Sequence, residues 1–267
     1  MREPVVAGRF YPANKKELQS LIEGFTKKSK PKLPARAIAV IVPHAGYVYS
    51  GRLAATTLKT VHIPETVLLL GPNHTGHGHP ASLSSEDWST PLGPVPANHD
   101  LTNLIINESR HIVIDEAAHR FEHSLEVQLP FLQTLQQKLS IVPITLGRLS
   151  YTECEEIAES LYRATLTYPK EVLIVASTDM NHFESQSVSQ AKDKLALDAI
   201  EALDPLALYT VVEKNKISMC GFVPVVITLL VSLKLDAKTA TLLDYMDSGE
   251  VSGDTGKVVG YAGVIIQ

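Results

Sequence analysis

Three short apolar runs, each followed by a polar loop that carries a histidine, constrain the fold of this chain more than any other feature. The runs cover residues 37–42, 66–70 and 171–176, and the histidines that follow them are His44, His74 and His182. Runs of this length that are rich in valine, isoleucine and leucine are typical of strands buried on both faces of a parallel sheet. Open α/β sheets bind their ligands at the carboxyl ends of such strands. The sequence therefore predicts that the three histidines lie at one edge of a central sheet.

Helix-like segments alternate with these strands and indicate an α/β fold. Helices are expected over residues 15–26, 52–61, 100–109, 152–167, 188–203, 205–214 and 222–233. Asn14 and Asp100 are the expected N-caps of the first and third helices, and a proline- and lysine-rich linker is expected over residues 27–36. The last two strands, over residues 239–249 and 257–267, are joined by a glycine-rich loop. We therefore predict one three-layer α/β/α domain over residues 1–267, with a mixed rather than purely parallel sheet.

The overall charge and composition exclude several classes of protein. A net charge of −5 gives no reason to expect nucleic-acid binding. The longest nearly apolar run, Phe222–Leu233, is too short to cross a bilayer, so no membrane association is expected. The first residues lack the apolar core of a signal peptide, and the two cysteines, Cys154 and Cys220, form no CxxC pair. We expect a cytoplasmic protein without a disulfide, in which Cys154 is structural or simply exposed.

His44 and His74 are the strongest candidates for metal ligands among the ten histidines. Each follows a buried strand within a few residues, and two histidines with one anionic ligand can hold a divalent transition metal while leaving positions open for substrate. The alternative for any single histidine is a surface or hydrogen-bonded core residue. His62 and His99 are assigned to that class.

Two further segments supply candidate groups for the same cleft. Asp179 and His182 follow the third strand, where Asp179 is expected to orient an imidazole or bind metal and His182 to act as acid or base. Cys220 lies between two predicted helices. Its thiol is either a small buried group or an accessible thiolate that completes a site with two histidines.

The pentapeptide from His119 to His123 matches the H-x-x-E-H pattern of inverted zincins. That interpretation requires the pentapeptide to be helical and a third ligand to come from a later helix. The pattern is short and matches by chance often, so the favoured interpretation is that Glu122 and His123 begin a helix and place polar groups at the cleft. No phosphate-binding loop or nucleophile elbow is present, so nucleotide binding and serine-hydrolase chemistry have no motif support.

The assembled motifs make the sequence resemble the Memo family, whose prokaryotic members are called AmmeMemoRadiSam system protein B. The motifs are AGRFYP at residues 7–12, PHAGYVYSG at 43–51, GPNHTG at 71–76, EHSLEVQLPFLQ at 122–133, STDMNHF at 177–183 and CG at 220–221. The resemblance implies a fold related to class III, LigB-type extradiol dioxygenases. It also implies metal ligation by His44, His74 and Cys220, with Asp179 and His182 in the same pocket. His123 falls in the matching EHS motif and joins the candidate catalytic groups, and Tyr47 and Tyr49 are expected to wall the pocket.

The resemblance carries expectations about chemistry and partners as well. Related dioxygenases use non-haem iron held by two histidines and a carboxylate, whereas a cysteine here also suits copper or zinc, so iron is the first expectation. The implied function is a metal-binding protein with a dioxygenase-like site and redox activity. Alternatives are a non-catalytic metal- or peptide-binding protein, or a zinc hydrolase. The family name implies a pathway link to an AMMECR1-like protein and a radical SAM protein, and the small-molecule substrate is unknown.

Overall fold

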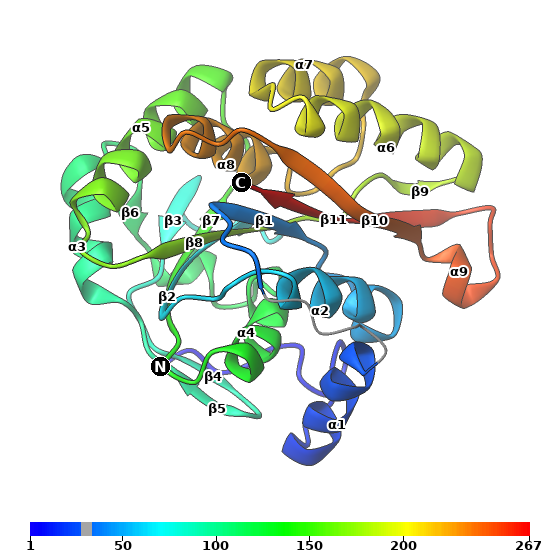
Figure 1. Ribbon diagram of the computed structural model, residues 1–267, viewed down its shortest axis with the longest axis horizontal. Helices are drawn as coiled ribbons and strands as arrows, with labels where there is room; N and C mark the ends of the chain where they lie inside the picture. Colours follow the sequence, from blue (N-terminus) through cyan, green and yellow to red (C-terminus); the bar gives the residue numbers. More distant parts are fainter. Residues whose placement is uncertain (28–33) are drawn as a thin grey trace.

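A large mixed sheet organises the chain, and its strand order places the first, second and third predicted strands next to one another. The computed structural model describes residues 1–27 and 34–267 (Figure 1). The main path of the sheet runs β10-β11-β1-β8-β2-β7-β3-β6, and β9 pairs with β11. The predicted α/β class with a mixed sheet is confirmed.

Four central strands run parallel and are buried. They are β1 (Ala39–Val42), β8 (Val172–Ser177), β2 (Thr66–Pro72) and β7 (Ser140–Leu146). Val42 lies beside Ser177, and Leu70 lies beside Ala176, so β1, β8 and β2 end at nearly the same level. This register brings the loops that follow the three strands to one edge of the sheet, as expected for parallel neighbours.

Shorter or antiparallel strands complete both sides of the sheet. β11 (Val258–Ile266) runs antiparallel to β1 and is followed outward by β10 (Ala240–Asp247). On the other side β3 (Ala81–Leu83) runs antiparallel to β7 and pairs with β6 (Val113–Ile114). β9 (His182–Glu184) pairs with β11. The expected excursion after His74 contains β3 and a separate hairpin of β4 (Trp88–Thr90) and β5 (Gly93–Val95).

Helices cover both faces of this sheet. In Figure 1 one group lies above the sheet and a second group lies below it. The upper group includes α5 (Tyr151–Thr167), α6 (Gln186–Glu201), α7 (Pro205–Asn215) and α8 (Phe222–Lys234). The lower group is α1 (Lys15–Thr26), α2 (Arg52–Lys59) and α4 (Leu129–Leu135). α3 (His99–Glu108) packs on α5, and the short α9 (Gly249–Ser252) follows β10.

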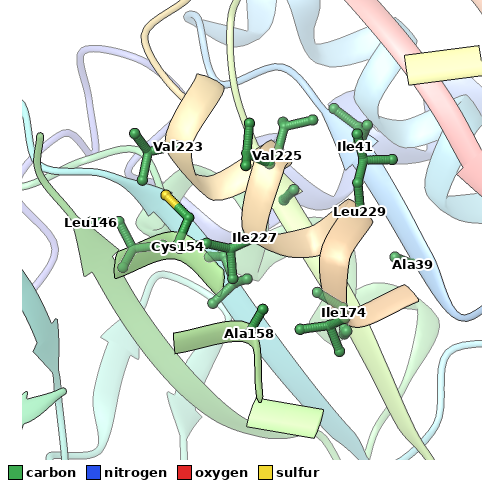
Figure 2. Close-up of a cluster of buried hydrophobic side chains, with 14 of the residues drawn as sticks. Ala39, Ile41, Leu146, Cys154, Ala158, Ile174, Val223, Val225, Ile227 and Leu229 are labelled. Carbon is green, nitrogen blue, oxygen red and sulfur yellow. The ribbon is translucent and has the colours of Figure 1, made fainter. Parts of the chain in front are cut away.

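Alternating side chains of the central strands divide the apolar core into two layers. Ala39 and Ile41 of β1 face the α5 and α8 side, whereas Val40 and Val42 face the α2 and α4 side. Figure 2 shows the first layer, in which α8 side chains meet those of the central strands and Cys154 of α5. Cys154 is fully buried, so it is structural rather than exposed. Burial raises the pKa of its thiol to about 12.

Two local expectations are corrected or refined by the structure. Asp100 does not cap α3, because the side chain of Asn98 accepts the hydrogen bond from the Leu101 backbone and the helix begins one residue before Asp100. Asn14 does cap α1. The linker expected over residues 27–36 lies largely outside the described residues. Among the residues that the structure describes, no helix has the length and apolar character needed to cross a bilayer.

Candidate metal centre

Three imidazole rings converge at the carboxyl edge of the central strands. His44 follows β1 and His74 follows β2, while His123 comes from the loop before α4. One ring nitrogen from each residue lies within 4.8 Å of the other two. The rings of His74 and His123 stack with their centroids 4.8 Å apart, and the edge of His44 meets both. Such a cluster of imidazoles is the donor set that divalent transition metals prefer.

A chain of hydrogen bonds fixes which nitrogen of His44 carries a proton. The Gln128 side-chain amide donates to the Pro43 carbonyl and to Ser177 Oγ, each at 2.9 Å. Ser177 Oγ donates its only proton to the Ser124 carbonyl at 2.7 Å, so it must accept from His44 Nδ1 at 3.0 Å. This assignment leaves His44 Nε2 with a free lone pair. Burial lowers the pKa of His44, and the neighbouring His74 and His123 lower it further, so the ring is neutral and able to ligate.

Glu122 orients His74 from the side away from the cluster. Its carboxylate accepts from His74 Nδ1 at 2.9 Å and from the backbone N–H groups of His74, His123 and Ser124. Burial raises the pKa of Glu122, but the hydrogen bond and charge of His74 and the Ser124 backbone N–H outweigh it and lower the pKa to about 2. An ionised carboxylate behind an imidazole fixes its tautomer and increases its basicity as a ligand.

His123 is held by aromatic contacts rather than by a strong hydrogen bond. Phe10 packs edge-on against its ring at 4.9 Å, and Glu122 Oε1 lies 3.6 Å from His123 Nδ1. Burial lowers the pKa of His123 despite the nearby Glu122. Phe10 belongs to the AGRFYP motif, so that motif supports the site from the N-terminal segment.

Cys220 lies at the edge of this cluster. Its Sγ is 3.3 Å from His44 Nε2 and accepts a hydrogen bond from the Asp179 backbone N–H at 3.3 Å. Burial raises the pKa of the thiol, and the charge of Asp179 adds to this effect. The adjacent Gly221 is required by close packing, because a Cβ there would lie 2.6 Å from the Ser177 carbonyl oxygen and from Thr178 Cβ. This contact fixes the position of Cys220 against the end of β8.

Asp179 and His182 both lie near the cluster, but they have different roles. Asp179 Oδ1 accepts from the His44 backbone N–H at 2.8 Å, and burial raises the pKa of its carboxyl group to about 7. The imidazoles are therefore oriented by Ser177 and Glu122, whereas Asp179 holds the backbone of the His44 loop. His182 Nδ1 donates to the Ser218 carbonyl at 2.8 Å, which leaves its Nε2 as an acceptor. Burial lowers the pKa of His182, so this ring is also neutral.

A buried ion pair supports the ligand loop and has no recognisable signal in the sequence. Arg2 Nη1 donates to Glu126 Oε2 at 2.8 Å, and the same guanidinium donates to the carbonyl oxygens of His119 and Glu122. Glu126 also accepts from the backbone N–H groups of Val5 and Val6 and from the Tyr11 hydroxyl. The N-terminal segment is thus tied directly to the loop that carries Glu122 and His123.

Comparisons with known proteins give the family. The family model described as Memo-like protein matches residues 2–265. The chain belongs to the Memo family. It is 39% identical over 272 residues to a MEMO1 family protein of Methanosarcina barkeri, with 100% of each chain covered. It is 42% identical over 279 residues to a MEMO1 family protein of Thermotoga maritima, with 99% of each covered.

The fold of this Memo-family chain is also found in a solved structure of low sequence similarity. An uncharacterised protein of Escherichia coli K12, JW3007, superposes with a TM-score of 0.59 at 12% identity. The match covers 85% of this chain and 99% of the other. Similarity at this level supports the fold alone.

In this Memo-family chain the structure excludes the inverted zincin alternative and contradicts the expected place of Tyr47. The pentapeptide from His119 to His123 is not helical and follows a short 3₁₀ turn. His119 is buried under Trp88 and donates from Nε2 to the Ser82 carbonyl, so it does not join the cluster and the inverted zincin interpretation fails. Tyr47 does not wall the pocket, because its ring is buried against Phe131 and its hydroxyl donates to the Val127 carbonyl.

Proposed function

We propose that the cluster of His44, His74 and His123, with Cys220 at its edge, binds one divalent transition-metal ion and supports redox chemistry on a small substrate. The observation that carries the proposal is the convergence of three imidazole nitrogens within 4.8 Å. Three protonated rings at this separation would repel one another, so the arrangement favours neutral rings that share a cation. The lowered pKa values of the buried His44 and His123 fit that state. Burial also lowers the pKa of His74, but the hydrogen bond and charge of Glu122 outweigh it and raise the pKa, so a bound cation would have to displace one proton from His74.

The donor set suits iron, copper and zinc, and iron is proposed first because of the resemblance to non-haem-iron dioxygenases. Imidazole suits all three metals, and a thiolate adds a soft donor that disfavours magnesium and calcium. Cys220 Sγ and the lone pair of His44 Nε2 lie 3.3 Å apart, so both can contribute once the thiol loses its proton. A redox-active ion held here supplies the capacity to bind and activate dioxygen or a substrate oxygen.

The protein groups around the cluster have separate tasks in this proposal. Glu122 and Ser177 keep the rings of His74 and His44 in their ligating tautomers. Asp179 fixes the backbone that carries His44. His182 is neutral with a free Nε2, so it can accept a proton from a bound substrate and return it.

Metal analysis of protein purified anaerobically under reducing conditions tests the binding step. The parent is expected to retain about one ion per chain, and His44→Ala, His74→Ala and His123→Ala are expected to lose it. Cys220→Ser should weaken retention and shift the preference away from soft metals. His62→Ala is the matched control, because this exposed histidine lies outside the cluster. If His44→Ala retains metal as well as the parent, the proposed site is wrong.

A second measurement separates a redox enzyme from the alternatives. Iron-loaded protein is screened under air with catechols and related aromatics, and oxygen consumption is recorded for the parent and for His182→Gln. Consumption that depends on His182 supports the enzyme. Tight metal or peptide binding without turnover would instead favour a binding protein, and zinc retention with esterase or phosphatase activity would favour a hydrolase.

A further inference from the structure

A cavity of about 530 Å³ opens beside the candidate metal centre and is not needed to explain the ligand cluster. His74 and Cys220 of the site line this cavity. Its other walls come from the loop after β7 and from the connection between α7 and α8, which lie far apart in the sequence. This volume is in the range of sites that hold small organic ligands.

The cavity has an apolar wall, and its lining also includes positive charge. The apolar wall consists of Leu146, Val212, Ile217, Met219, Phe222 and Val223. Three charged residues line the same cavity, namely Arg148, Glu213 and Lys216. Arg148 pairs with Glu213 at 3.2 Å, whereas Lys216 has no acidic partner among residues 1–27 and 34–267. The lining therefore carries one unpaired positive charge.

The backbone at Lys216 determines which substitution can test its side chain. Lys216 is the C-cap of α7 and has a φ of 49°, a left-handed conformation in which glycine is favoured. Because glycine suits this backbone better than lysine, Lys216→Gly can remove the side chain without straining the helix end. The N-terminus of α8 also favours a bound anion. Phe222 and Val223 of its first turn line the cavity, and this turn has no acidic residue or side-chain cap.

We propose that this cavity binds an organic monoanion with an apolar body and a carboxylate, and that Lys216 recognises the carboxylate. The inference rests on the proposed function, because it makes the cavity the substrate site of the metal centre. The apolar wall would cover the body of the ligand, and the ligand would then reach His74 and Cys220. A phosphate dianion is disfavoured, since Glu213 lies on the same lining and only one positive charge is unpaired.

Binding to the metal-free chain of residues 1–267 tests this inference separately from metal binding. Isothermal titration calorimetry compares 4-phenylbutyrate with its neutral amide, 4-phenylbutanamide, after treatment with a chelator. The acid is expected to bind at least about threefold more tightly than the amide, as a single charge contact at low salt would give. In metal-free protein this difference cannot arise from ligation of an ion, so failure here and failure to retain metal are distinct results.

Charge variants locate the contact. Lys216→Gln is expected to remove the preference for the acid, whereas Lys214→Gln, an exposed lysine two residues earlier that does not line the cavity, should keep it. Lys216→Gly should lose the preference while its melting temperature stays equal or rises, because glycine suits the left-handed backbone. A purely structural lysine would instead lower the melting temperature when replaced.

Two further ligands complete the test. Phenyl phosphate is expected to bind no more tightly than 4-phenylbutyrate. N-acetyl-Leu-Phe with a free or amidated carboxyl group then distinguishes a peptide carboxy-terminus from a free acid as the source of the anion. The inference is overturned if neither the acid nor the amide binds, if both bind equally, if the two lysine variants behave alike, or if phenyl phosphate binds more tightly.

Discussion

Replacing Arg2 tests how the N-terminal segment supports the candidate site. The Arg2 guanidinium is buried, lies 4.0 Å over the ring of Trp88 and donates to His119, Glu122 and Glu126. In Arg2→Ala the Glu126 carboxylate stays buried with its other donors but without a balancing charge. Removing one member of a buried ion pair costs about 3–5 kcal/mol of unfolding free energy. For a chain of this size that corresponds to a fall in melting temperature of roughly 6–20 °C.

The assay follows chemical unfolding by circular dichroism and by the fluorescence of Trp88, which is the only tryptophan and is in contact with Arg2. Arg2→Lys keeps the charge but not the forked geometry, so an intermediate loss is expected. Arg163→Ala is the control, since it removes an exposed arginine and should leave the stability unchanged within error. A loss below about 1 kcal/mol for Arg2→Ala, the range of a surface pair, would refute the reasoning.

Three other substitutions probe the site and the fold. Glu122→Gln should weaken metal binding about 10- to 100-fold, because the substitution removes the carboxylate that orients His74. Competition with a chelator measures the affinity. An unchanged affinity would show that His74 needs no anionic partner. Gly221→Ala should lower the melting temperature and metal retention together, because the new Cβ meets Ser177 and Thr178, and normal values for both would contradict that packing. Asp193 is buried, which raises its pKa to about 6 despite hydrogen bonds from the Asn181 backbone and Tyr245. The contribution of Asp193 to the free energy of unfolding is therefore full below about pH 4 and is lost as the pH rises through about 6. In urea unfolding, Asp193→Asn should have the same stability as the parent at pH 4 and a higher stability at pH 7. A variant that gains nothing between these pH values would show that Asp193 does not titrate in this way.

The sequence predicts the parts of the fold that depend on local pattern. Buried apolar runs identify β1, β2 and β8 within one or two residues, and the histidines after them lie at one edge of the sheet because the strands are parallel neighbours. The helix boundaries follow from caps and periodicity. The Asp100 error shows the limit of this approach, since Asn98 and Asp100 are both good caps and the contact with Leu101 decides between them.

The remaining features depend on contacts between distant segments. Ser177 and Gln128 fix the tautomer of His44 through hydrogen bonds across 49 to 133 positions of the chain. Arg2 and Glu126 are 124 positions apart, and no sequence motif next to either residue predicts a buried ion pair. Tyr47 illustrates the opposite error, because its place beside His44 in the sequence suggested the pocket while its ring packs in the core behind the strand.

Quantifying metal in anaerobically purified protein and in its triple variant His44→Ala, His74→Ala, His123→Ala tests the central claim most directly. Circular dichroism first establishes that the variant is folded, and the single variants stand in for it if it is not. About one transition-metal ion per parent chain, absent from the variant and unaffected by His62→Ala, is the predicted result. A parent that binds no transition metal, or a folded variant that retains it, would contradict the assignment of this cluster as a metal centre.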